Sequence, residues 1–285
     1  MSGNQSFDGR SLGKLVPSGL MAAVSGRPAQ AAADRGGADA GGAAACQASA
    51  SHEKTGAGVR VTFFDLDHTL LPIDSDYSWG VFTTTIGWTD RQEFGRRNDE
   101  FFAHYKAGTL DIHDYVRFAT DAVRRQGASN SIAAHAHFMR SVIEPALKKE
   151  ALALVQDHLD AGDTVVIVTA TNEFVTRPIA DAFGVQELIA VQLERDTAPG
   201  GSGWITGNIL GVPSAHEGKV TRVEQWLEQR NLGWSDIDST FYTDSINDLA
   251  LMEKVTHPVA TNPDARLRAV ASERGWRILD LFAAN

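Results

Sequence analysis

Apolar residues recur along this chain in short runs, and helical patterns stand between them. Such runs, rich in β-branched residues, are typical of strands buried inside a sheet. They cover residues 59–64, 164–171, 188–193, 258–261 and 276–281. The stretches between them, above all 172–183 and 264–274, have apolar positions at helical spacing. Strands that alternate with helices predict an α/β fold, a parallel sheet covered by helices on both faces, with ligands at the carboxyl ends of the strands.

One long helical stretch interrupts this alternation. From residue 75 to about residue 161, the apolar residues follow a helical period. Thr89 followed by Gln92 has the form of a capping box at the start of a first helix. A second helix is predicted to end near Gly127, and a third to cover residues 132–142. The pattern indicates a set of amphipathic helices inserted between the first strand and the second.

The first 58 residues differ from everything that follows. They are rich in Ala, Gly, Ser and Gln, with Phe7 as their only aromatic residue, and such a composition cannot bury enough apolar surface to order itself. A secretory signal is not predicted, because the apolar stretch 15–24 is broken at Pro17. We expect a disordered tail, or an upstream extension with the functional start near Met21 or later.

Composition and charge narrow the class of protein. The chain has 285 residues, of which 43% are hydrophobic and 22% charged, enough for a core domain and an insertion. Its net charge of -10 argues against nucleic acid as a partner. The single cysteine, Cys46, excludes an intrachain disulfide and favours a reducing, cytoplasmic location. No apolar stretch has the length of a membrane span.

Candidate chemistry begins directly after the first strand, where Asp65 and Asp67 stand two positions apart. Side chains two apart in a strand point the same way, and paired carboxylates repel unless a cation joins them. Mg²⁺ suits such a site, because it prefers oxygen ligands and takes one or two carboxylates plus substrate phosphate. The pair therefore indicates a phosphoryl-transfer site. The alternative is a loop in which both residues only cap a turn.

Three further features follow in order. The strand 164–171 ends in hydroxyls that include Thr169, which could bind phosphate oxygens. Lys219 opens a helical pattern and could offset negative charge in a transition state. A second acidic cluster, 241–248, again follows a strand-like run. Taken singly, Thr169 can be an ordinary strand residue and Lys219 a surface lysine, but in this order they predict one site.

Two other features resemble ligand-binding motifs without having the required spacing. The insertion holds four histidines, none of them in an HExxH or HxxEH arrangement, so a histidine metal cluster is not expected. They are His104, His113, His135 and His137. The glycine-rich run 199–203 lacks both a Walker lysine and a following helix, which predicts a hairpin or a flexible loop.

At this point the chain resembles the haloacid dehalogenase superfamily, whose phosphatases carry Asp-x-Asp-x-Thr, a strand ending in Thr or Ser, a Lys and a final acidic motif. All four stand in order here, and the resemblance spans roughly residues 59–281. It is greatest to the phosphoserine phosphatase-like branch. That branch implies a Rossmann-like core, residues 59–74 and 162–285, and a helical cap, residues 75–161, that closes over the site as a lid.

The resemblance also implies a role for each matching residue. Asp65 would be the nucleophile and Asp67 the general acid and base, with Lys219 neutralising phosphate. Mg²⁺ would be held by Asp65, Asp244 and the backbone carbonyl of Leu66. Substrate binding would fall to Thr169, the Ala170 N–H, Asn247 and Asp74, and Asp248 would position Lys219. The chain departs from the pattern twice, with Thr243 and Ala170 where the phosphoserine phosphatase branch has glycines.

The implied activity is hydrolysis of a small phosphorylated metabolite through an aspartyl-phosphate. The alternatives are a dehalogenase, a phosphotransferase or a non-catalytic binding protein; Asp67 and Asp244 argue against the first. An ATP-driven pump is excluded by the missing membrane spans. Both L-phosphoserine and L-histidinol phosphate carry an amine that Asp74 could contact. A substrate carboxylate would need Arg96, Arg97 or Arg117, and the sequence does not choose among them, nor does it indicate the oligomeric state.

Overall fold

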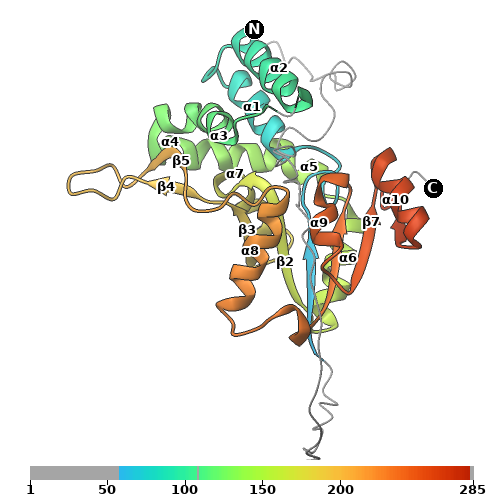
Figure 1. The fold of residues 1–285 in the computed structure, drawn as a ribbon. Coiled ribbons are helices and arrows are strands. Elements are labelled where there is room, and N and C mark those ends of the chain that lie inside the picture. The colour runs from blue at the N-terminus through green and yellow to red at the C-terminus, as the bar shows by residue number, and fades with distance from the viewer. Residues whose placement is uncertain (1–57, 108, 283–285) are drawn as a thin grey trace, which may run out of the picture.

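The structure is a computed structural model that describes residues 58–107 and 109–282. The predicted tail therefore lies outside the described residues, apart from Gly58. The described chain has a sheet with helices on its faces, and a group of helices that follows the first strand (Figure 1). Within the described ranges, no helix is both long and apolar enough to cross a bilayer.

The centre of the fold is a six-stranded sheet in the order β3-β2-β1-β6-β7-β8, in which every neighbouring pair is parallel. Its strands are β1 (Val59–Phe64), β2 (Thr164–Asn172), β3 (Glu187–Val191), β6 (Ile237–Thr243), β7 (His257–Thr261) and β8 (Arg277–Leu279). The predicted Rossmann-like α/β fold class is confirmed.

Side chains of β1 alternate between the two faces of this sheet. Phe63 packs into one buried cluster and Phe64 into the other, as the period of two in a strand requires. Helices that contribute to the Phe63 cluster are α8 (Glu217–Glu228), α9 (Leu249–Met252) and α10 (Ala265–Arg274). Those that contribute to the Phe64 cluster include α6 (Lys149–Asp160) and α7 (Glu173–Ala182). Both faces are therefore covered, which explains why the last four residues of β1 are all buried.

Helices fill the chain between β1 and β2. They are α1 (Ser75–Thr85), α2 (Arg91–Ala107), α3 (Ile112–Ala119), α4 (Asp121–Phe138), a π-helix (Met139–Ile143), α5 (Glu144–Ala146) and α6. Figure 1 shows α1 and α2 beyond the upper end of β1. The last of these helices, α6, instead packs against β2. The division into a core and a cap domain stays a prediction.

One detail of the insertion differs from the sequence predictions. The capping box is wrong: Asp90, not Thr89, caps α2, since its carboxylate accepts the backbone N–H groups of Gln92 (2.9 Å) and Glu93 (2.8 Å). Thr89 instead accepts a hydrogen bond from Thr83. The predicted helix end near Gly127 is confirmed, because α4 consists of two helical parts that meet at Gly127, whose φ of 72° and ψ of 174° are not helical.

The glycine-rich run lies in the turn of an antiparallel pair, β4 (Leu193–Arg195) and β5 (Ile205–Ile209). The hairpin prediction is confirmed. This hairpin contacts α3 and α4, and so joins the end of β3 to the helical insertion. Short 3₁₀-helices at Trp234–Asp236 and Ile246–Asp248 complete the described elements.

Candidate active site

The strand order places the candidate residues at one edge of the sheet. The chain runs outward from β1 through β2 to β3, then returns to β6 on the other side of β1. Ligands of open α/β sheets bind at such a reversal, outside the carboxyl ends of the strands. Asp65 follows β1 and Asp244 follows β6, so the topology alone brings the two predicted acidic motifs together.

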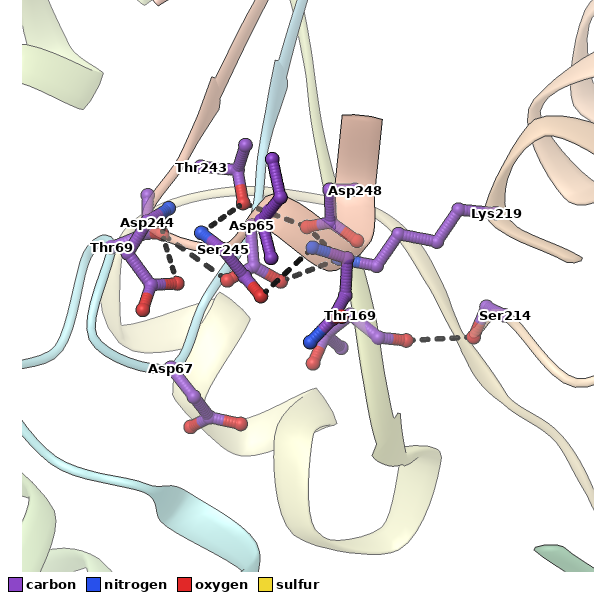
Figure 2. Close-up of polar contacts among 12 residues, drawn as sticks. Asp65, Asp67, Thr69, Thr169, Ser214, Lys219, Thr243, Asp244, Ser245 and Asp248 are labelled. Carbon is purple, nitrogen blue, oxygen red and sulfur yellow. Dashed lines mark hydrogen bonds and ion pairs between the residues drawn. The ribbon is translucent and has the colours of Figure 1, made fainter. Parts of the chain in front are cut away.

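A buried ion-pair network lies at this edge (Figure 2). The Lys219 ammonium, in the first turn of α8, is 2.7 Å from Asp65 Oδ1 and 2.7 Å from Asp248 Oδ2. Burial raises the pKa of the Asp65 carboxyl to about 7, against the opposing charge of Lys219. Burial lowers the pKa of Lys219, but Asp248 and Asp65 more than offset it and raise the pKa overall. Lys219 is therefore a buried cation, with only 3% of its surface exposed, and not a surface lysine.

Thr243, the first departure from the family pattern, takes part in this network. Its hydroxyl donates to Asp248 Oδ2 at 2.7 Å and accepts the backbone N–H of Ser245 at 3.2 Å. Asp248 thus has two donors at one oxygen, Thr243 and Lys219. Replacing a glycine by threonine here adds a hydrogen bond that orients Asp248. The predicted placement of Asp248 beside Lys219 agrees with this geometry.

Thr69, to which the sequence analysis assigned no role, joins the two acidic motifs. Its Oγ1 is 3.2 Å from Asp65 Oδ2 and 3.3 Å from Asp244 Oδ1, and it accepts the Asp244 backbone N–H at 3.0 Å. A hydroxyl has one hydrogen, so it can donate to only one carboxylate at a time. Burial, and then the charge of Asp65, raise the pKa of Asp244 well above its usual range. Thr69 is the threonine of the Asp-x-Asp-x-Thr pattern, and this place in the motif was the sequence signal that could have identified it as a site residue.

Asp67 lies outside this network, and Figure 2 shows its carboxylate pointing away from Lys219. Oδ1 accepts the backbone N–H of Ser75 at 2.8 Å, and Oδ2 accepts the Thr171 hydroxyl at 2.9 Å. Burial, and then the neighbouring Asp74, raise the pKa of Asp67 to about 6. Asp74 itself caps α1 by accepting the Tyr77 backbone N–H at 2.9 Å. Asp67 is therefore held by neutral donors, in a setting where it can gain or lose a proton.

The predicted phosphate-binding residues lie in an irregular part of β2. Its pairing with β3 shifts register between Val168 and Asn172, and such bulges are frequent beside active sites. Thr169 Oγ1 accepts the Thr171 backbone N–H at 3.1 Å, and the Thr169 carbonyl accepts the Ser214 hydroxyl at 2.7 Å. The Thr169 hydroxyl still has its hydrogen to donate. Ala170 lies within the same irregular stretch.

One predicted metal ligand is wrong. The Leu66 carbonyl oxygen accepts the backbone N–H groups of Leu70 at 2.9 Å and Leu71 at 3.0 Å. Both of its lone pairs are therefore used inside the loop that follows β1, and it is not placed to bind a metal. The alternation of strand side chains says nothing about a carbonyl in a loop, which is why the sequence could not exclude this.

The predicted arginines lie on the helical insertion. Arg96 pairs with Glu93 and Glu100 on the exposed surface of α2. Arg97 and Arg117 line a cavity of about 810 Å³. Other residues that line this cavity are Asp76, Tyr77, Phe94, Phe101, Tyr115 and Phe118.

Two more predicted positions have clear places in the structure. Asn247 lies in the 3₁₀-helix that also contains Asp248. His135 is buried and donates through Nε2 to the Val175 carbonyl at 3.0 Å, which agrees with the expectation that it is not a metal ligand.

Comparison with known proteins agrees with this geometry. Residues 62–253 match the haloacid dehalogenase-like hydrolase family. The chain belongs to this family. It is 38% identical over 221 residues to a histidinol-phosphatase of Neisseria meningitidis, covering 77% of this chain and 98% of the relative. It is 29% identical over 231 residues to a phosphoserine phosphatase of Mycobacterium tuberculosis, covering 78% of this chain and 71% of that one.

Two solved structures share the fold of this chain. A protein of unknown function from Bordetella pertussis Tohama I is 46% identical, with a TM-score of 0.74 over 79% of this chain and all of that one. A substrate-bound phosphoserine phosphatase is 13% identical, with a TM-score of 0.52 over 78% of this chain and 93% of its own. At this low identity the second comparison shows the fold alone.

The donor set at the sheet edge fits a divalent cation. Asp65 and Asp244 converge on one hydroxyl, and burial raises the pKa of each; the charge of Asp65 adds to the rise at Asp244. A hard cation between them would relieve their repulsion. Among residues 58–107 and 109–282, no group of three or more His, Cys, Asp or Glu side chains could hold a metal ion. Two carboxylates are enough for Mg²⁺, which takes water and substrate oxygens as its other ligands.

Proposed function

We propose that this hydrolase is a Mg²⁺-dependent phosphomonoesterase that acts on a small phosphorylated metabolite through an aspartyl-phosphate on Asp65. One observation carries the proposal. The carboxylates of buried Asp65 and half-buried Asp67 lie two residues apart, yet one is bonded to a lysine and the other only to neutral donors. A nucleophile must be ionised and a general acid must carry a proton, and this arrangement provides a separate setting for each.

The chemistry consists of two displacements at phosphorus. In the first, an oxygen of Asp65 attacks phosphorus and the ester P–O bond breaks, while Asp67 gives its proton to the leaving oxygen. In the second, water attacks the same phosphorus and gives a proton to Asp67, which releases inorganic phosphate and frees Asp65. Lys219 stabilises negative charge beside Asp65, and the Thr169 hydroxyl and the Ala170 N–H donate to phosphate oxygens. Positioning and electrostatics supply the catalysis.

Mg²⁺ would be held by Asp65 and Asp244. When bound, it neutralises the charge of the phosphate and draws it toward the nucleophile. Thr69 keeps the two carboxylates at the same point before the cation arrives, because both lie within hydrogen-bond distance of its hydroxyl.

Among candidate substrates, L-histidinol phosphate is favoured over L-phosphoserine. A relative that matches along nearly its whole length is a histidinol-phosphatase. Burial, and then the charges of Asp74 and Asp67, raise the pKa of Asp76; burial also raises the pKa of Asp74, and the charge of Asp65 adds to that rise. Several acidic groups gathered at this edge of the sheet would attract a leaving group with a cationic nitrogen and repel one with a carboxylate.

Hydrolysis of both phosphates, with Mg²⁺ and with EDTA, tests the proposal. We expect release of inorganic phosphate with Mg²⁺, loss of activity with EDTA, and a higher kcat/KM for L-histidinol phosphate. Asp65→Asn should abolish both turnover and trapped phosphoenzyme, since its amide is a poor nucleophile. The matched control is Asp99→Asn, on the exposed surface of α2, which should keep full activity. Normal turnover by Asp65→Asn, or equal rates in EDTA, would reject the mechanism.

A further inference from the structure

One more buried carboxylate near the site takes no part in the two displacements described above. Asp76, in the first turn of α1, is 7% exposed. Its Oδ2 accepts the Tyr115 hydroxyl at 2.8 Å, and its Oδ1 accepts the Asn172 side-chain amide at 3.2 Å. The three residues come from α1, from α3 and from the end of β2. This cluster therefore ties two helices of the insertion to the sheet.

The residues next to this cluster in the chain are the two that hold Asp67. Ser75, which precedes Asp76, donates its backbone N–H to Asp67 Oδ1 at 2.8 Å. Thr171, which precedes Asn172, donates its hydroxyl to Asp67 Oδ2 at 2.9 Å. The bond between Asp76 and Asn172 thus fixes the distance between the two donors that face the two oxygens of Asp67.

The amide of Asn172 is itself held in one orientation. Its Oδ1 accepts the Val175 backbone N–H at 3.2 Å and so caps α7. Its Nδ2 is then the atom directed at Asp76. Because Asn172 is fixed to α7, a change at Tyr115 or Asp76 would move the α1 side of the cluster and leave the β2 side in place. Ser75 would then shift relative to Thr171.

Folding stability does not explain the cluster. Burial, and then the charges of Asp74 and Asp67, raise the pKa of Asp76 to about 7, and the Tyr115 hydroxyl opposes the rise. A buried carboxylate that is bonded only to neutral groups costs folding free energy. Residues that break a packing rule in this way are most often found where function requires them.

We propose that Asp76 and Tyr115 are positioning residues that set the orientation of the Asp67 carboxyl by fixing its two donors, Ser75 and Thr171. The inference rests on the proposed function, in which Asp67 protonates the leaving oxygen. Neither residue needs to touch the reacting phosphate. The cluster acts through the alignment of α1 against the end of β2. The position of a helix of the insertion therefore determines how the Asp67 carboxyl is oriented for proton transfer.

Tyr115→Phe tests this connection, because it removes one hydroxyl and keeps the ring. A misplaced general acid slows the departure of an alkoxide, which needs a proton, far more than that of 4-nitrophenolate, which does not. The measurement is kcat/KM, which reports the steps up to departure of the leaving group. We expect Tyr115→Phe to lower kcat/KM for L-histidinol phosphate by about tenfold or more, and for 4-nitrophenyl phosphate by less than about threefold. Asp76→Asn should have the same selective effect.

Tyr242→Phe is the matched control. The Tyr242 hydroxyl is buried like that of Tyr115, and its partner is His158 Nε2 at 2.9 Å, on α6. This variant loses a comparable hydrogen bond but should keep the wild-type ratio between the two substrates. An equal loss on both substrates in Tyr115→Phe, or no loss on either, would overturn the positioning role. Failure of the wild type to hydrolyse either phosphate would instead reject the proposed function.

Discussion

Two groups of buried acids meet at the same edge of the sheet, and they differ in what holds them. The lysine-paired group consists of Asp65, Asp244 and Asp248, around Lys219. The neutral-donor group consists of Asp67, Asp74 and Asp76, whose partners are backbone N–H, hydroxyl and amide groups. Burial raises the pKa of carboxylates in both. Only the first group has a buried ammonium bonded to it.

The difference separates two chemical tasks that one residue type must perform. An ammonium bonded to a carboxylate favours its anionic form, which is what an attack on phosphorus requires. A carboxyl held by neutral donors can alternate between its two protonation states, as an acid and base must. The fold achieves this because Lys219 reaches Asp65 from α8, whereas α1 presents only N–H groups to Asp67. Asp65 and Asp67 stand two residues apart, yet the surrounding elements differ.

The largest expected effect comes from removing the cation that distinguishes the two groups. Lys219→Met would leave Asp65 and Asp248 buried without an opposite charge. We expect kcat to fall by about 10³-fold and the free energy of unfolding to fall by about 3 kcal/mol or more. Steady-state hydrolysis and urea unfolding measure the two effects.

Lys254→Met provides the control for this variant. Lys254 is exposed, and its nearest carboxylate is Glu224 at 3.6 Å, a surface pair that contributes little to stability. Both kcat and the free energy of unfolding should stay close to wild type. If Lys219→Met unfolds at the same urea concentration as Lys254→Met, the lysine-paired group does not depend on its cation.

Asp67→Asn tests the neutral-donor group and should separate activity from stability. Turnover should fall by about 10²- to 10⁴-fold, because no proton reaches the leaving group. The free energy of unfolding at pH 8 should instead rise by about 1 kcal/mol, since the change removes a buried charge that Asp74 repels. Urea unfolding in EDTA, with Asp99→Asn as the exposed control, measures this. A loss of stability as large as that of Lys219→Met would show that the two groups are alike.

The sequence was sufficient to predict those site residues whose place in the structure follows from their order along the chain. Asp65, Asp67 and Asp244 follow apolar runs, and parallel strands bring such positions to one edge whatever the loops do. Lys219 could be identified in the same way, from its place in the order of motifs. The alternation of strands and helices likewise predicted the fold class, because burial on both faces leaves a plain apolar signature.

Contacts between distant elements could not be predicted. The bonds from Asp76 to Tyr115 and Asn172 join positions 39 and 96 residues apart, and no periodicity reports such a pairing. Leu66 was misassigned because a carbonyl has no sequence signature, and its partners Leu70 and Leu71 depend on the loop conformation. The capping box predicted at Thr89 was wrong because Thr89 and Asp90 are both good N-cap residues, and the sequence does not show which of the two begins the helix.

In both acidic groups, burial and neighbouring charges shift the pKa together. His135 allows the effect of burial on a pKa to be measured by itself. Burial lowers the pKa of His135 to about 4, partly offset by its bond to the Val175 carbonyl. Its pKa is thus lower in the folded state than in the unfolded chain, where it is near 6.5. The stability that neutral His135 supports is present above about pH 6.5 and is lost as the pH falls toward 4, because the unfolded chain takes up the proton first.

This loss should be on the order of 3 kcal/mol between pH 6.5 and 4. The measurement is urea unfolding of the wild type and of His135→Gln across that range, with exposed His113→Gln as control. His135→Gln can still donate to Val175 but does not titrate, so its unfolding free energy should depend less on pH than that of the wild type. Parallel curves for all three proteins would mean that burial alone does not shift a pKa in this fold. The raised pKa values of both acidic groups would then have to come from the charges beside them.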